Sequence, residues 1–196
     1  MSAAQKEAPA GSLHELIRKR WSIRAFSDKQ LTQEELHTLI EAASWAPSSM
    51  NGQPWRFVYM FNGERIFEEA IGALMPGNQS WAKNASVLLL VLAKKNFDQE
   101  GNPVNRHALH DSGAATASLL LQGISMGIYG HIMGGFDMHK VRKIFAVPEN
   151  MEVASIVALG YAGSPHTLEE PFRSRELAQR TRKEVKEIAF HGRLPE

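Results

Sequence analysis

The chain contains no cysteine among its 196 residues. Disulfides, zinc–thiolate sites and cysteine nucleophiles are therefore excluded. A chain without cysteine is typical of a reducing compartment, and we expect a cytoplasmic protein. The formal net charge is only +1, which argues against binding nucleic acid or an anionic membrane through overall charge, so basic residues must act locally.

Long apolar runs are also missing. The longest, residues 85–93, has the length of a strand, well short of the ~18 residues of a membrane-spanning helix. Residues 1–11 are small and polar, without the apolar segment of a secretory signal, and we interpret them as a flexible N-terminal tail. We expect residues 12–196 to form one domain, because this length suffices for a single core.

Signature motifs of the common nucleotide-binding folds are absent too. No G-x-G-x-x-G or Walker loop occurs. His107 and His110 are three residues apart and precede Asp111, but no further ligand is evident nearby, so we predict no metal site. Asp111 is better explained as the N-cap of a helix over residues 111–126, whose small and apolar residues predict burial in the fold or at an interface.

The remaining pattern predicts an α+β fold without regular βαβ alternation. Apolar spacing and a Thr32–Glu35 capping box predict a helix ending near Pro47. Further helices are expected at the ranges 64–73 and 137–145, with a short one at 181–188. Strands are expected at 56–61, 85–93, 129–132 and 153–159, and the second of these, apolar on both faces, should be central. The polar segment 94–106 reads as a mobile loop.

Two polar clusters stand out between residues 18 and 57. RKRWSIR (18–24) places four cationic side chains around Ser22. A solvated helix end with cations near its C-terminus would also explain it. The turn PSSMNGQP (47–54) carries more hydrogen-bonding groups than a connection needs, and such loops often bind ligands. Together the clusters suit an anionic ligand with polar edges.

Two weaker motifs lie further along the chain. Gly134 and Gly135 follow an expected strand and would permit close approach of the backbone to a flat ligand, although a plain turn is an equal alternative. Arg180 and Arg182 flank a threonine and could clamp a phosphate, although an exposed tail would look the same.

Taken together, RWSIR, APSSMNGQPW, GGFD and the late R-x-R resemble the FMN-dependent nitroreductase family in order and approximate spacing. The resemblance spans nearly the whole chain from Ser12 onward. It implies a central, mainly antiparallel sheet flanked by helices, and a homodimer with FMN at the subunit interface. The C-terminal extension would wrap the partner subunit.

The resemblance also implies roles for individual residues. One group would contact phosphate, ribityl chain and pyrimidine edge of the flavin: Arg20, Trp21, Ser22 and Arg24. A second would reach the flavin of the other subunit: Pro47, Ser48, Ser49 and Asn51. Asn78 would lie beside the ring, the amides of Gly134 and Gly135 would face its N5–O4 edge, and Arg180 and Arg182 would grip the phosphate. No catalytic side chain is predicted.

The implied activity is reduction of bound FMN by NAD(P)H through hydride transfer to N5. A nitroaromatic, quinone or similar acceptor would then take the electrons in a ping-pong cycle. Two alternatives stay open. One is a specialised enzyme of the same fold, a reductive deiodinase or a flavin-cleaving enzyme, for which segment 94–106 is the only obvious lid. The other is a flavin-binding protein without turnover.

Overall fold

The computed structural model describes residues 13–195. The expected flexible tail, residues 1–11, lies outside this range. Four antiparallel strands form one sheet in the order β1-β2-β4-β3. The strands are β1 (Trp55–Phe61), β2 (Val87–Lys94), β3 (Ile128–Met133) and β4 (Met151–Tyr161). The predicted α+β class and the central position of the apolar strand are confirmed.

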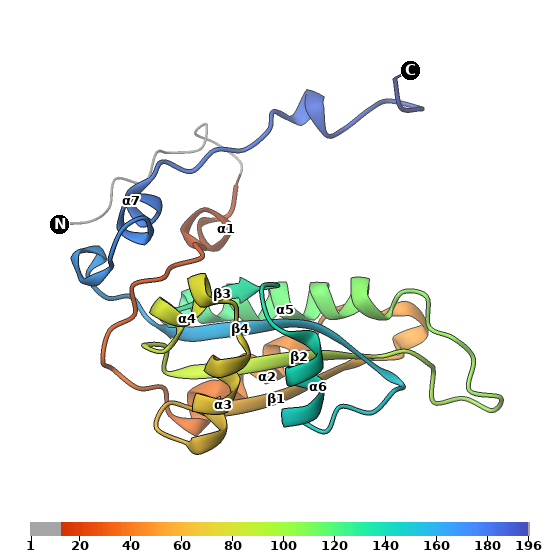
Figure 1. The fold of residues 1–196 in the computed structure, drawn as a ribbon. Helices are drawn as coiled ribbons and strands as arrows, with labels where there is room; N and C mark the ends of the chain where they lie inside the picture. Colours follow the sequence, from red (N-terminus) through yellow and green to blue (C-terminus); the bar gives the residue numbers. More distant parts are fainter. Residues whose placement is uncertain (1–12, 196) are drawn as a thin grey trace.

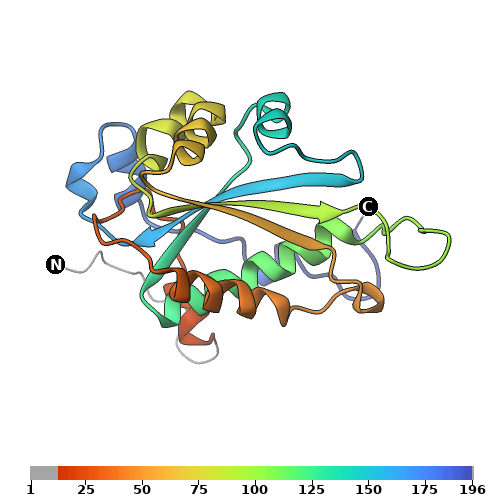
Figure 2. The ribbon, with the colours of Figure 1, turned by 90° about the horizontal axis from the view of Figure 1, so that it is seen from below.

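Helices cover both faces of this sheet (Figure 2). One face packs against α2 (Gln33–Ser44) and α5 (Ala108–Ser125), whose Leu36, Leu39 and Leu119 are buried beside strand residues. The other face packs against α3 (Arg65–Ala73), α4 (Pro76–Ala82) and α6 (Met138–Ile144). β2 contributes apolar side chains to both cores, which explains why its sequence does not alternate.

The predicted capping box at the start of α2 is confirmed. The Thr32 hydroxyl accepts from the amide of Glu35, and the Glu35 carboxylate accepts from the amide of Thr32. The predicted N-cap Asp111 is wrong. α5 begins one turn earlier, after His107, and Asp111 lies inside its first turn with a buried carboxylate.

Short helical elements complete the fold, one of them between α2 and β1 and the others towards the two ends of the chain. They are α1 (Glu15–Lys19), the 3₁₀ turns η1 (Ser49–Asn51), η2 (Pro165–Thr167) and η3 (Val185–Glu187), and α7 (Phe172–Leu177). The helix expected at 181–188 is only the single turn η3. After α7 the chain runs past α1 and away from the sheet (Figure 1). We call residues 178–195 the C-terminal arm.

The arm makes little contact with the sheet and carries exposed apolar side chains, among them Val185, Ile188 and Leu194. Within residues 13–195, no helix is long and apolar enough to cross a bilayer.

Candidate functional site

A cavity of about 300 Å³ lies where the chain leaves α1. Its lining residues are Arg20, Trp21, Ser22, Arg24, Arg175 and Arg182. Four of these six are arginines, and no carboxylate belongs to the lining formed by the described residues. The structure thus brings together five residues predicted from the sequence and adds Arg175 of α7. We call this space the arginine cavity.

The electrostatics of the arginine cavity favour an anion. Burial lowers the pKa of Arg20, and the positive charges of Arg182 and Arg180 lower it further. The guanidinium of Arg20 also donates to the Ser22 hydroxyl at 3.4 Å. Crowded guanidinium groups repel one another, and an anionic ligand among them would relieve that repulsion.

Arg180 is placed differently from Arg182. Its guanidinium donates to the main-chain carbonyls of Arg20, at 2.7 Å, and of Arg18. It also lies 5.0 Å from the ring centroid of Trp21, within the range of a cation–π contact. These contacts dock the start of the C-terminal arm onto the segment after α1. Arg180 is not among the residues that line the arginine cavity.

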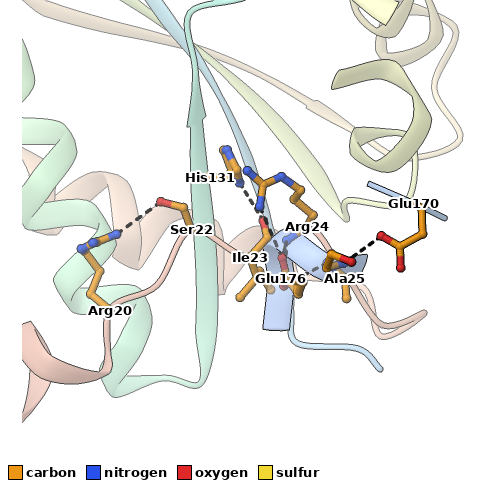
Figure 3. A network of polar contacts seen from close by, with 9 residues as sticks. Arg20, Ser22, Ile23, Arg24, Ala25, His131, Glu170 and Glu176 are labelled. Atoms are coloured by element: carbon orange, nitrogen blue, oxygen red, sulfur yellow. Dashed lines mark hydrogen bonds and ion pairs between the residues drawn. The ribbon is translucent and has the colours of Figure 1, made fainter. Parts of the chain in front are cut away.

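A buried carboxylate holds the backbone of the cationic segment (Figure 3). Both oxygens of Glu176, in α7, accept from the amide of Arg24 at 3.0 Å, and Oε1 also accepts from the amide of Ala25 at 3.4 Å. The Arg24 guanidinium lies 3.7 Å from Glu176 Oε2. The sequence gives no signal for Glu176, because a glutamate in a charged tail is usually solvated.

His131 connects the same segment to β3. Its Nδ1 donates to the carbonyl of Ile23 at 2.9 Å, and its ring lies 4.5 Å from that of Trp81 in α4. Burial lowers the pKa of His131 to about 4, despite the hydrogen bonds to the carbonyls of Ile23 and Ser22, and the charge of Arg24 lowers it as well. His131 is therefore neutral near pH 7 and donates as a single tautomer.

Gly134 and Gly135 follow β3 directly. The carbonyl of Gly135 accepts from the amide of Met75 at 2.9 Å and from the side-chain amide of Asn78 at 3.2 Å. A Cβ atom at Gly135 would come within 3.0 Å of Asn78 Nδ2, whereas one at Gly134 would meet nothing within 4 Å. The structure thus brings the predicted Asn78 beside the predicted glycine pair, with open space next to Gly134.

The turn with Pro47, Ser48, Ser49 and Asn51 is anchored to α5. Asp111 Oδ2 accepts from the amide of Ser49 at 2.9 Å, and Asp111 Oδ1 lies 3.1 Å from His110 Nδ1. Three non-glycine residues of this turn have positive φ: Met50 (53°), Asn51 (52°) and Gln53 (43°). Such angles cost energy and persist only where surrounding contacts impose them.

The segment expected to be a mobile loop, 94–106, packs beside this turn. It folds back on itself as a small hairpin, in which Phe97 donates from its amide to the carbonyl of Pro103. The Phe97 ring comes so close to Gly52 that a Cβ there would lie 2.8 Å from it.

The two polar clusters lie at opposite ends of the sheet. Phe26, two residues after Arg24, pairs with Ala162. Trp55, which follows the turn, pairs with Ala93, which in turn pairs with Glu152. The extended stretch 152–162 covers roughly 30 Å at ~3.3 Å per residue. One small ligand cannot contact both clusters of the same chain.

The chain is similar to known proteins over most of its length. The Nitroreductase family model matches residues 17–75 and 61–161. An uncharacterised 15.4 kDa protein of Mycolicibacterium smegmatis is 35% identical over 130 residues, covering 66% of this chain and 85% of that protein. A protein of Archaeoglobus fulgidus, provisionally named NADH dehydrogenase/NAD(P)H nitroreductase, is 32% identical over 154 residues. The alignment covers 74% of this chain and 83% of that protein.

Solved structures also resemble this chain over nearly its whole length. One described as an oxidoreductase containing FMN aligns with a TM-score of 0.91 and 33% identity, covering 100% of this chain and 99% of that one. A nitroreductase-like protein of Desulfovibrio desulfuricans in complex with FMN aligns with a TM-score of 0.71 and 20% identity. The alignment covers 92% of this chain and 96% of that one. The second likeness shows a shared fold.

Proposed function

The chain belongs to the nitroreductase family, and from that premise we propose that it is an FMN-dependent oxidoreductase. It would use NAD(P)H to reduce a nitroaromatic, quinone or similar acceptor in a ping-pong cycle. The arginine cavity supports this proposal most strongly, because its four guanidinium groups match the negative charge of a phosphate monoester.

The residues of the arginine cavity fit the FMN phosphate. A phosphate monoester carries about −1.5 to −2 charges at neutral pH. Arg20 and Arg182 would neutralise it through paired N–H donors, a geometry suited to phosphate oxygens, and the Ser22 hydroxyl would add a third donor. Arg175 lies close enough to line the same cavity. Arg180 would support this site by docking the arm.

When bound, the flavin supplies the hydride chemistry, and the protein supplies binding and orientation. Gly134 and Gly135 would let the backbone approach the ring, since neither has a side chain in the way. Arg24 would place positive charge beside the pyrimidine edge. We assign no side chain as a proton donor or acceptor.

We further propose a homodimer in which each flavin contacts both subunits. The separation of roughly 30 Å between the clusters supports this, because Pro47, Ser48, Ser49 and Asn51 would then serve the flavin held by the partner's arginine cavity. The exposed apolar side chains of the C-terminal arm also favour burial against another subunit.

A specialised flavin enzyme with a lid is a weaker candidate. The only segment suggested for a lid, 94–106, forms a small hairpin that packs on Gly52. A flavin-binding protein without turnover remains the second candidate, and activity separates it from the first.

The first test is the cofactor content of the purified protein. We expect a yellow protein that releases FMN on denaturation and oxidises NADH or NADPH only when an acceptor such as a quinone is present. A colourless protein that does not bind added FMN would refute the proposal. Bound FMN without acceptor-dependent oxidation of NAD(P)H would favour the non-catalytic alternative.

A further inference from the structure

We infer that Glu176 is a positioning residue that orients Arg24 and partly neutralises its charge, and so lowers the reduction potential of the flavin. The inference rests on the proposed function, since it assumes FMN in the arginine cavity. It concerns a residue outside the sequence motifs, contributed by α7 just before the C-terminal arm.

The contacts of Glu176 all converge on one short segment. Its two oxygens accept from the amides of Arg24 and Ala25, and Oε2 lies 3.7 Å from the Arg24 guanidinium. The Glu176 side chain is 5% exposed, and that of Arg24 is 21% exposed. Figure 3 shows the carboxylate between the α7 ribbon and the backbone at Arg24 and Ala25.

Burial of this carboxylate requires compensation. An ionised carboxylate out of water is costly unless it is paired and hydrogen-bonded, and here backbone amides and a guanidinium provide both. The two residues differ in where they lie. Arg24 lines the arginine cavity, whereas Glu176 does not. A ligand in the cavity would therefore meet Arg24 directly and sense Glu176 through it.

Glu176 therefore reduces the positive electrostatic potential that Arg24 would exert on a ligand in the cavity. A cation beside the pyrimidine edge favours the reduced, negatively charged flavin and raises its potential. A carboxylate within 4 Å of that cation opposes the effect, and does so strongly because both side chains are largely excluded from water. Glu176 would thus keep the flavin more strongly reducing.

A purely mechanical role is the competing explanation. Glu176 could simply dock α7 against the segment after α1, as Arg180 docks the arm. Loss of docking would weaken FMN binding in both redox states, whereas loss of charge would change the relative affinity for reduced and oxidised flavin. The midpoint potential of bound FMN therefore separates the two.

The test is the midpoint potential of the FMN-loaded protein, with Glu176→Gln as the principal variant. Glutamine keeps the size and an accepting oxygen but removes the charge. We expect reduced flavin to gain about tenfold in affinity relative to oxidised flavin, an upward shift of about 30 mV for a two-electron couple. Glu169→Gln, an exposed glutamate before α7, should leave the potential unchanged.

Two further variants test whether the charge of Glu176 causes the shift and whether Arg24 is needed for it. Glu176→Asp keeps the charge and should keep the wild-type potential, so an equal shift in both variants would overturn the inference in favour of mechanical docking. In an Arg24→Gln background, Glu176→Gln should shift the potential clearly less, because the part of the effect that comes from orienting Arg24 is gone. A full shift there would overturn the claim that Glu176 acts through Arg24.

Failure of the inference differs from failure of the proposed function. If the wild-type protein binds FMN and Glu176→Gln leaves its potential unchanged, the inference alone is wrong. If the wild-type protein binds no FMN, the proposed function is wrong and the inference falls with it.

Discussion

The carboxylate of Asp111 accepts a hydrogen bond from the amide of Ser49 at 2.9 Å, across 62 residues of sequence. Asp111 is 4% exposed, so this contact ties the first turn of α5 to the strained turn before β1. The amide of Ser49 is thereby occupied, so the flavin contact proposed for this residue falls to its hydroxyl. The turn is held in shape before any ligand or partner arrives.

Asp111→Ala should destabilise the protein. The substitution removes a buried acceptor from the Ser49 amide, and a loss of about 2 kcal/mol in the free energy of unfolding is expected for a charged hydrogen bond. Urea denaturation measures it. Asp28→Ala, at an exposed position, should change the stability by less than about 0.5 kcal/mol. Equal effects of the two variants would show that the contact does not stabilise the turn.

Arg182→Ala should weaken FMN binding by about 1.5–3 kcal/mol, the value of a hydrogen bond to a charged group. Isothermal titration of the apoprotein with FMN measures the loss. Arg193→Ala, an exposed arginine further along the arm, is the matched control and should bind as wild type does. Ser49→Ala should have a smaller effect than Arg182→Ala. Wild-type affinity of the Arg182 variant would remove this residue from the phosphate site.

A mixed dimer tests whether each flavin contacts both subunits. One subunit carries Arg182→Ala and the other Asn51→Ala, and each variant alone should bind FMN weakly at every site. If Arg182 and Asn51 at one flavin come from different subunits, the mixed dimer has one intact site and one doubly altered site. FMN titration should then show one site of wild-type affinity per dimer. Two weakened sites, with none of wild-type affinity, would mean that both residues come from the same chain.

The stability of the protein should fall between pH 7.5 and pH 5, partly because of His131. Its pKa of about 4 in the folded protein lies below its ordinary value of 6.5, so the unfolded chain binds the additional proton first as the pH falls. Stability due to neutral His131 is therefore complete above pH 6.5 and decreases towards pH 4. The loss at pH 5 is about 2 kcal/mol.

Urea denaturation at the two pH values checks this, with His131→Asn as the test variant. Asparagine does not titrate, so the variant should lose about 2 kcal/mol less than wild type over the same interval. His166→Asn, at an exposed position, should retain the wild-type pH dependence. The same slope in His131→Asn as in wild type would assign the effect to other groups.

Much of the sheet could be predicted from the sequence, because its signals are local. β2 is apolar at almost every position. Thr32 and Glu35 cap the start of α2 through contacts between these two residues only. α4 could not be predicted, because PGNQSWA combines weak helix formers. Its stability comes from Trp81, which is buried against Phe26 and His131, and such contacts between distant segments leave no periodic pattern.

The candidate site shows the same division. Arg20, Ser22 and Arg24 could be found because they form a dense motif in a short stretch. Glu176 and Asp111 could not, since each acts on a backbone amide far away in the chain. A single glutamate in a charged tail and an aspartate near a helix start have common local explanations, and only the fold shows what they contact.

The central claim, that this chain uses NAD(P)H to reduce bound FMN, is tested most directly by anaerobic stopped-flow mixing of the FMN-loaded protein with NADH or NADPH. The visible flavin absorbance should bleach with at least one of the two and return when a quinone is added. A flavin that stays oxidised with both would show that this chain does not use NAD(P)H to reduce FMN.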